Sequence, residues 1–149
     1  MIAILDFGSQ YSKIIARKIR ESSIYCEVFP HTTSLEEIQK LNYKGVILSG
    51  GPCSVFDESS PRCDENLFSS QIPVLGICYG MQLMAQTLGG EITKGKSHEY
   101  GAANLLIDNN FDLFEGLWLE MAIWMSHGDI IKSFDESWDV LALSDNDHT

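Results

Sequence analysis

The stretch IPVLGICYGMQLMAQTLGG, residues 72–90, places a strand, a tight turn and a helix in direct succession. Residues 72–77 form an apolar run of strand length, and the helix expected over residues 79–88 stops at Gly89 and Gly90, because glycine is the usual residue just past a helix end. The segment therefore predicts a strand that enters a helix through a turn at Cys78.

The same alternation of strand and helix occurs upstream of this stretch. Ser34 and Glu37 have the spacing of a capping box, which marks the start of a helix. The run at residues 45–50 is apolar throughout, as in a parallel strand covered on both faces. We expect strands at residues 2–5, 24–29, 45–50 and 72–77, and helices at residues 11–19, 34–41, 61–69 and 79–88. This pattern predicts an α/β fold with a three-layer, open, mostly parallel sheet and helices on both faces.

Beyond Gly90 the signals for secondary structure are weaker. We expect further strands at residues 104–107, 120–125 and 139–144, with less helix between them. We find no repeat and no linker composition, and a chain of 149 residues is long enough to bury roughly 70% of its unfolded surface in one core. Residues 1–149 are therefore expected to form one domain.

Composition and charge exclude several classes of function. The formal charge of −11, from 21 acidic and 10 basic residues, disfavours binding to nucleic acid or to an anionic membrane. The N-terminus lacks the pattern of a signal peptide, and no apolar run approaches the roughly 18 residues of a membrane helix. Four cysteines without CxxC spacing argue against zinc sites and disulfide scaffolds. We expect a soluble cytoplasmic protein without a metal site.

Cys78 is the candidate nucleophile. It lies in a GxCxG sequence after a predicted strand, which matches the GxSxG nucleophile elbow with sulfur in place of oxygen. The start of the following helix favours a thiolate there, and ligands of parallel α/β sheets bind beyond the carboxyl ends of the strands. The alternative is a buried structural cysteine, which we favour for Cys26, Cys53 and Cys63.

Acyl transfer also requires hydrogen-bond donors for the oxyanion. The backbone amide of Tyr79, directly after the nucleophile, is one candidate. Gly51, in LSGGP at residues 48–52, is the second, because its lack of a side chain allows close approach to a substrate. The alternative for Gly51 is a simple turn before Pro52.

Five segments, taken in order, resemble the class I glutamine amidotransferases, and among them the glutaminase domains of GMP synthetases. They are ILDFGSQY, GVILSGGPCSV, PVLGICYGMQLMAQTLGG, HEYG and WMSHGD, and together they extend over nearly the whole chain. The resemblance implies a flavodoxin-like fold. It also implies that glutamine is hydrolysed to supply ammonia for the ATP-dependent amination of XMP to GMP.

The resemblance assigns roles to individual residues. Cys78 corresponds to the nucleophile that forms a γ-glutamyl thioester, and the amides of Gly51 and Tyr79 correspond to the oxyanion hole. The residues that correspond to the binding site for L-glutamine are Gln82, Ser126, His127, Gly128 and Asp129. A carboxylate such as that of Asp129 suits the ammonium group of an amino acid. In the family the catalytic base is a different histidine, in an HPE motif, so His127 is not expected to be that base.

The sequence contains no HPE motif and no SGGxDS phosphate loop. The resemblance places ATP and Mg²⁺ in a separate ATP pyrophosphatase domain, and dimerisation in a C-terminal region, neither of which is in this sequence. We expect a fragment of a GMP synthetase; the alternative is a short protein that has lost hydrolysis. Without a base, general acid–base catalysis worth roughly 10²- to 10⁴-fold is missing, so the chain alone should turn over little glutamine.

Other functions stay open at this stage. The chain has the features of an inactive module that binds glutamine or docks on a partner, and an amidotransferase domain that serves a different synthetase would share its glutaminase motifs. A cysteine hydrolase of the dienelactone type or a DJ-1-like protein would share the elbow at Cys78 but would not account for WMSHGD.

Overall fold

The computed structural model describes residues 1–108, 112–134 and 136–144. It divides the chain into two compact units, Met1–Leu88 and Gly89–Thr149, and each unit is described by itself below. The single-domain interpretation of the sequence stays a prediction.

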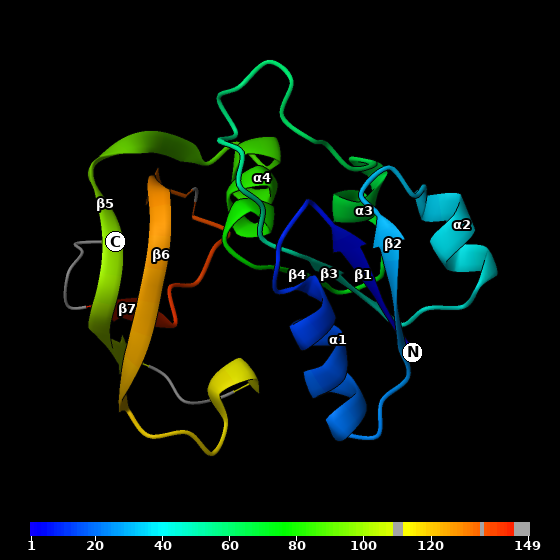
Figure 1. Ribbon diagram of the computed structural model, residues 1–149, viewed down its shortest axis with the longest axis horizontal. Coiled ribbons are helices and arrows are strands. Elements are labelled where there is room, and N and C mark those ends of the chain that lie inside the picture. Colours follow the sequence, from blue (N-terminus) through cyan, green and yellow to red (C-terminus); the bar gives the residue numbers. More distant parts are fainter. Residues whose placement is uncertain (109–111, 135, 145–149) are drawn as a thin grey trace. The chain divides into compact units, whose positions relative to one another are not determined.

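The first unit is built on a parallel sheet of four strands (Figure 1). The strands are β1 (Ile2–Asp6), β2 (Cys26–Pro30), β3 (Gly45–Leu48) and β4 (Val74–Gly76), in the spatial order β2-β1-β3-β4. This is the beginning of the flavodoxin-like order, in which the chain first adds a strand on one side of β1 and then continues on the other. The direction reverses between β1 and β3, and the loops that follow these two strands are therefore where a ligand site is expected.

Four helices accompany the sheet: α1 (Ser12–Glu21), α2 (Leu35–Lys40), α3 (Asn66–Ser69) and α4 (Tyr79–Thr87). Ser34 caps the start of α2 as predicted, since the amide of Glu37 donates to Oγ of Ser34 at 3.2 Å. The prediction of a helix over residues 61–69 is wrong for residues 61–65, because α3 begins only at Asn66. The carboxylate of Asp64 accepts hydrogen bonds from the amides of Leu35 (2.9 Å) and Asn66 (3.1 Å), which holds the preceding chain against α2 rather than in a helix.

Helices cover both faces of this sheet. Ala16 of α1 packs with Ile4 and Cys26 on one face. Side chains alternate along a strand, so Leu48 of β3 points to the other face, where α4 begins at Tyr79 and Gly80 lies directly against Leu48. The predicted three-layer α/β class is confirmed. Cys26 is fully buried, and its thiol donates to the carbonyl oxygen of Ala16 at 3.3 Å, in agreement with a structural role.

The second unit is an antiparallel sheet of three strands, β5 (Glu91–Ile107), β6 (Glu120–Ser133) and β7 (Ala142–Ser144), in the order β6-β5-β7. The strands expected at residues 104–107 and 120–125 lie inside β5 and β6, which are much longer than predicted. A 3₁₀ turn, η1 (Asp112–Phe114), lies in the connection between them. Antiparallel pairing needs no helical crossover between strands, which explains why the alternation of strand and helix stops after residue 88.

Candidate active site

Loops from three strands meet at the carboxyl edge of the first unit's sheet (Figure 1). The three loops follow β1, β3 and β4. A Cβ atom placed on Gly50 would lie 3.5 Å from Cβ of Cys78 and 3.7 Å from Oγ of Ser9. The loop after β3 therefore lies between the loop after β1 and the candidate nucleophile, at the position where the strand order reverses.

Cys78 has the strained backbone of a nucleophile elbow. Its φ of 50° and ψ of −113° lie in a region that residues with a side chain rarely adopt, and such a conformation costs of order 1–3 kcal/mol. Hydrogen bonds on both sides hold it. The amide of Gly80 donates to the carbonyl oxygens of Ile77 (3.0 Å) and Ser49 (3.1 Å), and the amide of Gln82 donates to that of Cys78 (3.0 Å).

The flanking glycines of GxCxG are required by packing. A Cβ on Gly76 would lie 2.5 Å from Cα and 2.6 Å from the amide nitrogen of Met81, so the strand and the helix meet backbone to backbone at this point. A Cβ on Gly80 would likewise lie 2.5 Å from the carbonyl oxygen of Leu48. Glycine at position 76 allows β4 to approach α4 this closely, and glycine at position 80 allows α4 to approach β3.

Cys78 is a partly exposed residue and forms no disulfide. It therefore differs from the fully buried Cys26, and the alternative of a cysteine sealed in the core does not describe it. Cys53 and Cys63 are also free and partly exposed, but neither lies at the junction of a strand and a helix.

The reactivity of Cys63 toward alkylation can be predicted from its surroundings. Burial raises the pKa of the Cys63 thiol to about 11. At about pH 8 only roughly one thiol in a thousand would then be ionised, so Cys63 should react with iodoacetamide about a hundredfold more slowly than an unperturbed cysteine. Mass-spectrometric mapping of alkylated peptides over time measures this rate. Alkylation of Cys63 that keeps pace with Cys78 at this pH would contradict the prediction.

Tyr79 anchors the elbow with its side chain. The side chain is fully buried, its hydroxyl donates to the carbonyl oxygen of Pro61 at 2.6 Å, and its ring centroid lies 5.4 Å from that of Phe7. Burial raises the pKa of the Tyr79 phenol, so the group stays a donor at all moderate pH values. Its amide lies in the first turn of α4, where N–H groups have no partner within the helix.

We expect Tyr79→Phe to lower the free energy of unfolding by about 1 kcal/mol, because the carbonyl oxygen of Pro61 loses its donor. Urea unfolding followed by circular dichroism measures this loss. The control is Tyr11→Phe, at a side chain that is largely exposed. Equal midpoints for the two variants would show that the hydroxyl of Tyr79 contributes nothing to anchoring.

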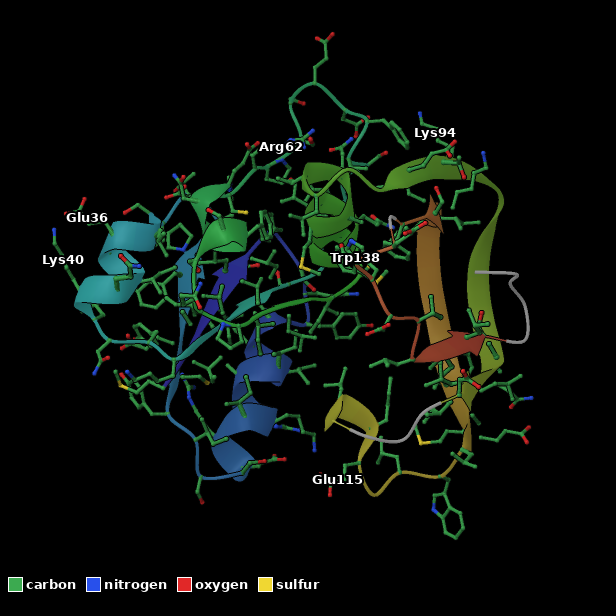
Figure 2. All side chains as sticks on the ribbon, turned by 180° about the vertical axis from the view of Figure 1, so that it is seen from behind. Glu36, Lys40, Arg62, Lys94, Glu115 and Trp138 are labelled. Atoms are coloured by element: carbon green, nitrogen blue, oxygen red, sulfur yellow. The ribbon has the colours of Figure 1, made fainter. Side chains whose placement is uncertain are left out.

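The loop between Gly51 and α3 is held to α4 by Arg62 (labelled in Figure 2). Its guanidinium donates to Oε1 of Gln86 on α4 at 2.6 Å and to the carbonyl oxygen of Val55 at 3.1 Å. Position 51 itself tolerates no side chain, because a Cβ there would lie 2.6 Å from the carbonyl oxygen of Phe7. Gly51 is therefore packed directly against the loop that follows β1.

The residues expected to bind glutamine fall in both units. Gln82 lies one turn into α4 and is 4% exposed. Ser126, His127, Gly128 and Asp129 lie on β6 in the second unit, where Ser126 pairs with Tyr100 and Asp129 with Lys94 in the register of β5. The side chains of residues 126–128 are outside the described residues. Tyr79 and Gln82 belong to the helix that begins at Cys78, and Gly51 follows Gly50, whose Cβ would lie 3.5 Å from Cβ of Cys78. The roles of these three residues and of residues 126–129 stay predictions.

Sequence patterns gave no role to two residues that build this edge. Asp6 ends β1, and its Oδ1 accepts hydrogen bonds from the amide of Gly8 (2.9 Å) and from Oγ of Ser12 (2.8 Å), which fixes the loop after β1. Ser49 follows β3 and is fully buried. Both are polar residues at the carboxyl ends of adjacent strands, and this position is the signal in the sequence that could have identified them.

Among the residues that the structure describes, no group of three or more His, Cys, Asp or Glu side chains is placed to hold a metal ion. No helix in the described part of the chain has the length and apolar character needed to cross a membrane.

Comparison with known proteins agrees with this geometry. The family model "Glutamine amidotransferase class-I" matches residues 3–149. The chain is 55% identical over 144 residues to GMP synthase [glutamine-hydrolyzing] of Bacillus subtilis, a match that covers 97% of this chain and 28% of that protein. It is 50% identical to the same enzyme of Rippkaea orientalis, covering 98% of this chain and 27% of the relative. The chain thus spans little more than a quarter of the length of these relatives.

Solved structures show the same fold. A Thermoplasma acidophilum protein described as a subunit of GMP synthase superposes with a TM-score of 0.85 at 26% identity, covering 97% of this chain and 72% of that one. A glutamine amidotransferase of Thermotoga maritima superposes with a TM-score of 0.74 at 22% identity, covering 97% and 66%. The family resemblance found in the sequence motifs is confirmed: the chain belongs to the class I glutamine amidotransferases.

Proposed function

We propose that this chain is the glutaminase part of a glutamine-hydrolysing GMP synthase, with Cys78 as its nucleophile. The observation that carries the proposal is the strained, partly exposed Cys78 beside the glycine loop after β3, in a chain of the class I amidotransferase family. A strained elbow of this kind persists only where the surrounding structure holds it, and such strain is concentrated at functional sites.

The reaction follows from the groups at the elbow. The thiolate of Cys78 attacks the side-chain carbonyl carbon of L-glutamine, and the amides of Gly51 and Tyr79 stabilise the negative charge that develops on the oxygen. The C–N bond breaks, the nitrogen takes up a proton and leaves as ammonia, and a γ-glutamyl thioester remains on sulfur. Water then attacks the thioester, which releases L-glutamate and returns the thiol.

The amino-acid end of glutamine needs charged and polar partners. Asp129 suits the α-ammonium group, and Gln82 and residues 126–128 supply further contacts, as the family resemblance implies. The proton transfers need a base, and the sequence has no HPE motif to supply one. Slow turnover by this chain alone is therefore part of the proposal.

The acceptor of the ammonia is proposed from the relatives. They are GMP synthases several times longer than this chain, so the ATP-dependent amination of XMP to GMP would take place in a synthetase part, with ATP and Mg²⁺ bound there. Purine biosynthesis in the cytoplasm and dimerisation through that further part belong to the same proposal.

Protection of the thiol by substrate tests the glutaminase role. We expect L-glutamine to slow alkylation of Cys78 by iodoacetamide in a concentration-dependent manner, while D-glutamine has little effect and the rate at Cys53 does not change. The absence of any stereospecific protection of Cys78 would overturn the proposal. Protection without acylation by an activated glutamyl ester would instead favour a module that binds glutamine, the alternative suggested by the missing HPE motif.

A further inference from the structure

Ser49 connects the loop after β1, the loop after β3 and the first turn of α4. It follows β3 directly, and its side chain is 0% exposed. Its amide donates to the carbonyl oxygen of Leu5 at 3.0 Å, and its carbonyl oxygen accepts from the amide of Gly80 at 3.1 Å. The backbone of Ser49 therefore ties the end of β1 to the first turn of α4, immediately after Cys78.

The hydroxyl of Ser49 makes two further hydrogen bonds in the interior. Oγ accepts from the amide of Phe7 at 3.0 Å and donates to the carbonyl oxygen of Gly50 at 2.9 Å. A serine hydroxyl has a single proton to donate, so accepting from Phe7 directs this proton to Gly50. Both partners are backbone groups of loops at this edge: Phe7 lies in the loop after β1, and Gly50 lies in the loop that borders Cys78.

The bond to the carbonyl oxygen of Gly50 also determines the direction of a neighbouring N–H. This carbonyl and the amide of Gly51 belong to one peptide group, which is planar and trans, so the C=O and N–H point in opposite directions. A glycine stands on each side of this peptide, and glycine offers the least steric resistance to rotation. The hydroxyl of Ser49 holds the peptide in one of its orientations.

We infer that Ser49 is a positioning residue that orients the Gly51 amide for the oxyanion of the acyl-transfer step. The inference rests on the proposed function, in which this amide is an oxyanion donor. Preorganised donors stabilise a transition state without reorganisation, and the loss of one such donor costs roughly 10²- to 10³-fold in rate. Ser49 would not touch the substrate; it would act through the peptide between Gly50 and Gly51.

An activated substrate tests this role without requiring the missing base. The γ-para-nitrophenyl ester of L-glutamate should acylate Cys78: the thiolate forms the C–S bond, the ester C–O bond breaks, and para-nitrophenolate leaves with the electron pair and needs no proton. The burst of para-nitrophenolate measures the step that depends on the oxyanion. Alkylation of Cys78 by iodoacetamide passes through no oxyanion, so it serves as an internal control for an intact elbow.

We expect Ser49→Ala to slow the acylation burst at least about tenfold while the alkylation rate of Cys78 stays within about twofold of the wild type. The matched control is Ser70→Ala. Oγ of Ser70 also donates to a carbonyl oxygen, that of Leu67 at 2.8 Å, and accepts from an amide, that of Ile72 at 3.2 Å, but it lies before β4, at the other end of that strand from Cys78. Ser70→Ala should leave both rates unchanged.

The outcomes separate the inference from the function on which it rests. If the wild type shows a burst and Ser49→Ala leaves it unchanged, the positioning role is overturned. An equal loss of acylation and alkylation in Ser49→Ala also overturns it, because such a loss indicates only a damaged fold. No burst in the wild type overturns the glutaminase proposal itself. If Ser49→Ala does not fold, as judged by circular dichroism, Ser49→Gly removes the same hydroxyl and is judged by the same two rates.

Discussion

We expect Cys78→Ala and Cys78→Gly to abolish acylation by the glutamyl ester, a loss of at least about a thousandfold, because neither variant has a nucleophile. The two variants should nevertheless differ in stability. The φ of 50° at position 78 is strained for alanine and accessible to glycine. Cys78→Gly should therefore be more stable than Cys78→Ala by about 1 kcal/mol, the reverse of the usual effect of glycine next to a helix.

Urea unfolding followed by circular dichroism of the helices compares these two variants, and all α-helices in the described part of the chain belong to the first unit. The control is the pair Ser69→Gly and Ser69→Ala in α3, where the alanine variant should be the more stable of the two. Equal or lower stability of Cys78→Gly relative to Cys78→Ala would mean that position 78 is not strained. In that case the elbow geometry would be wrong.

Gly80→Ala should be among the most destabilising single substitutions in the first unit, at about 3 kcal/mol. In an exposed helix, alanine in place of glycine stabilises by about 1 kcal/mol. Here the new Cβ would lie 2.5 Å from the carbonyl oxygen of Leu48 and 2.6 Å from its Cβ, so α4 would have to move away from β3. This movement would also displace Cys78, and acylation should fall together with stability.

Gly45→Ala is the matched control for this substitution. The new Cβ there would lie 3.0 Å from Cδ1 of Ile2, the end of a flexible side chain that can rotate away, and the cost should stay below about 1 kcal/mol. Urea midpoints of the two variants give the comparison. If Gly80→Ala is no less stable than Gly45→Ala, the close contact between α4 and β3 does not exist in solution.

The sequence predicted the first unit well because its signals are local. The capping box at Ser34 and Glu37 and the glycines around Cys78 each specify structure within a few residues, and the structure has the expected features at both places. The start of α3 was missed because the side chain of Asp64 bonds to the amide of Leu35, 29 residues earlier, and no local pattern reports such a contact.

The second unit was harder to predict for a physical reason. β5 contains Gly, Lys, Ser and Asn, residues with low strand propensity, and it is paired over most of its length by β6. Pairing between distant segments can override local preference, so only the apolar part at residues 104–107 was recognised. Ser49 shows the same limit at the site, since its hydroxyl bonds to the amide of Phe7, 42 residues away.

Peptide mapping after reaction with the glutamyl ester tests the nucleophile most directly. The chain is incubated with the γ-para-nitrophenyl ester of L-glutamate, quenched in acid and digested, and the acylated peptide is identified by mass spectrometry. We expect the γ-glutamyl group on Cys78 alone, with competition by L-glutamine. An adduct absent from Cys78, or present to a similar extent on Cys53 and Cys63, would contradict its assignment as the nucleophile of this amidotransferase fold.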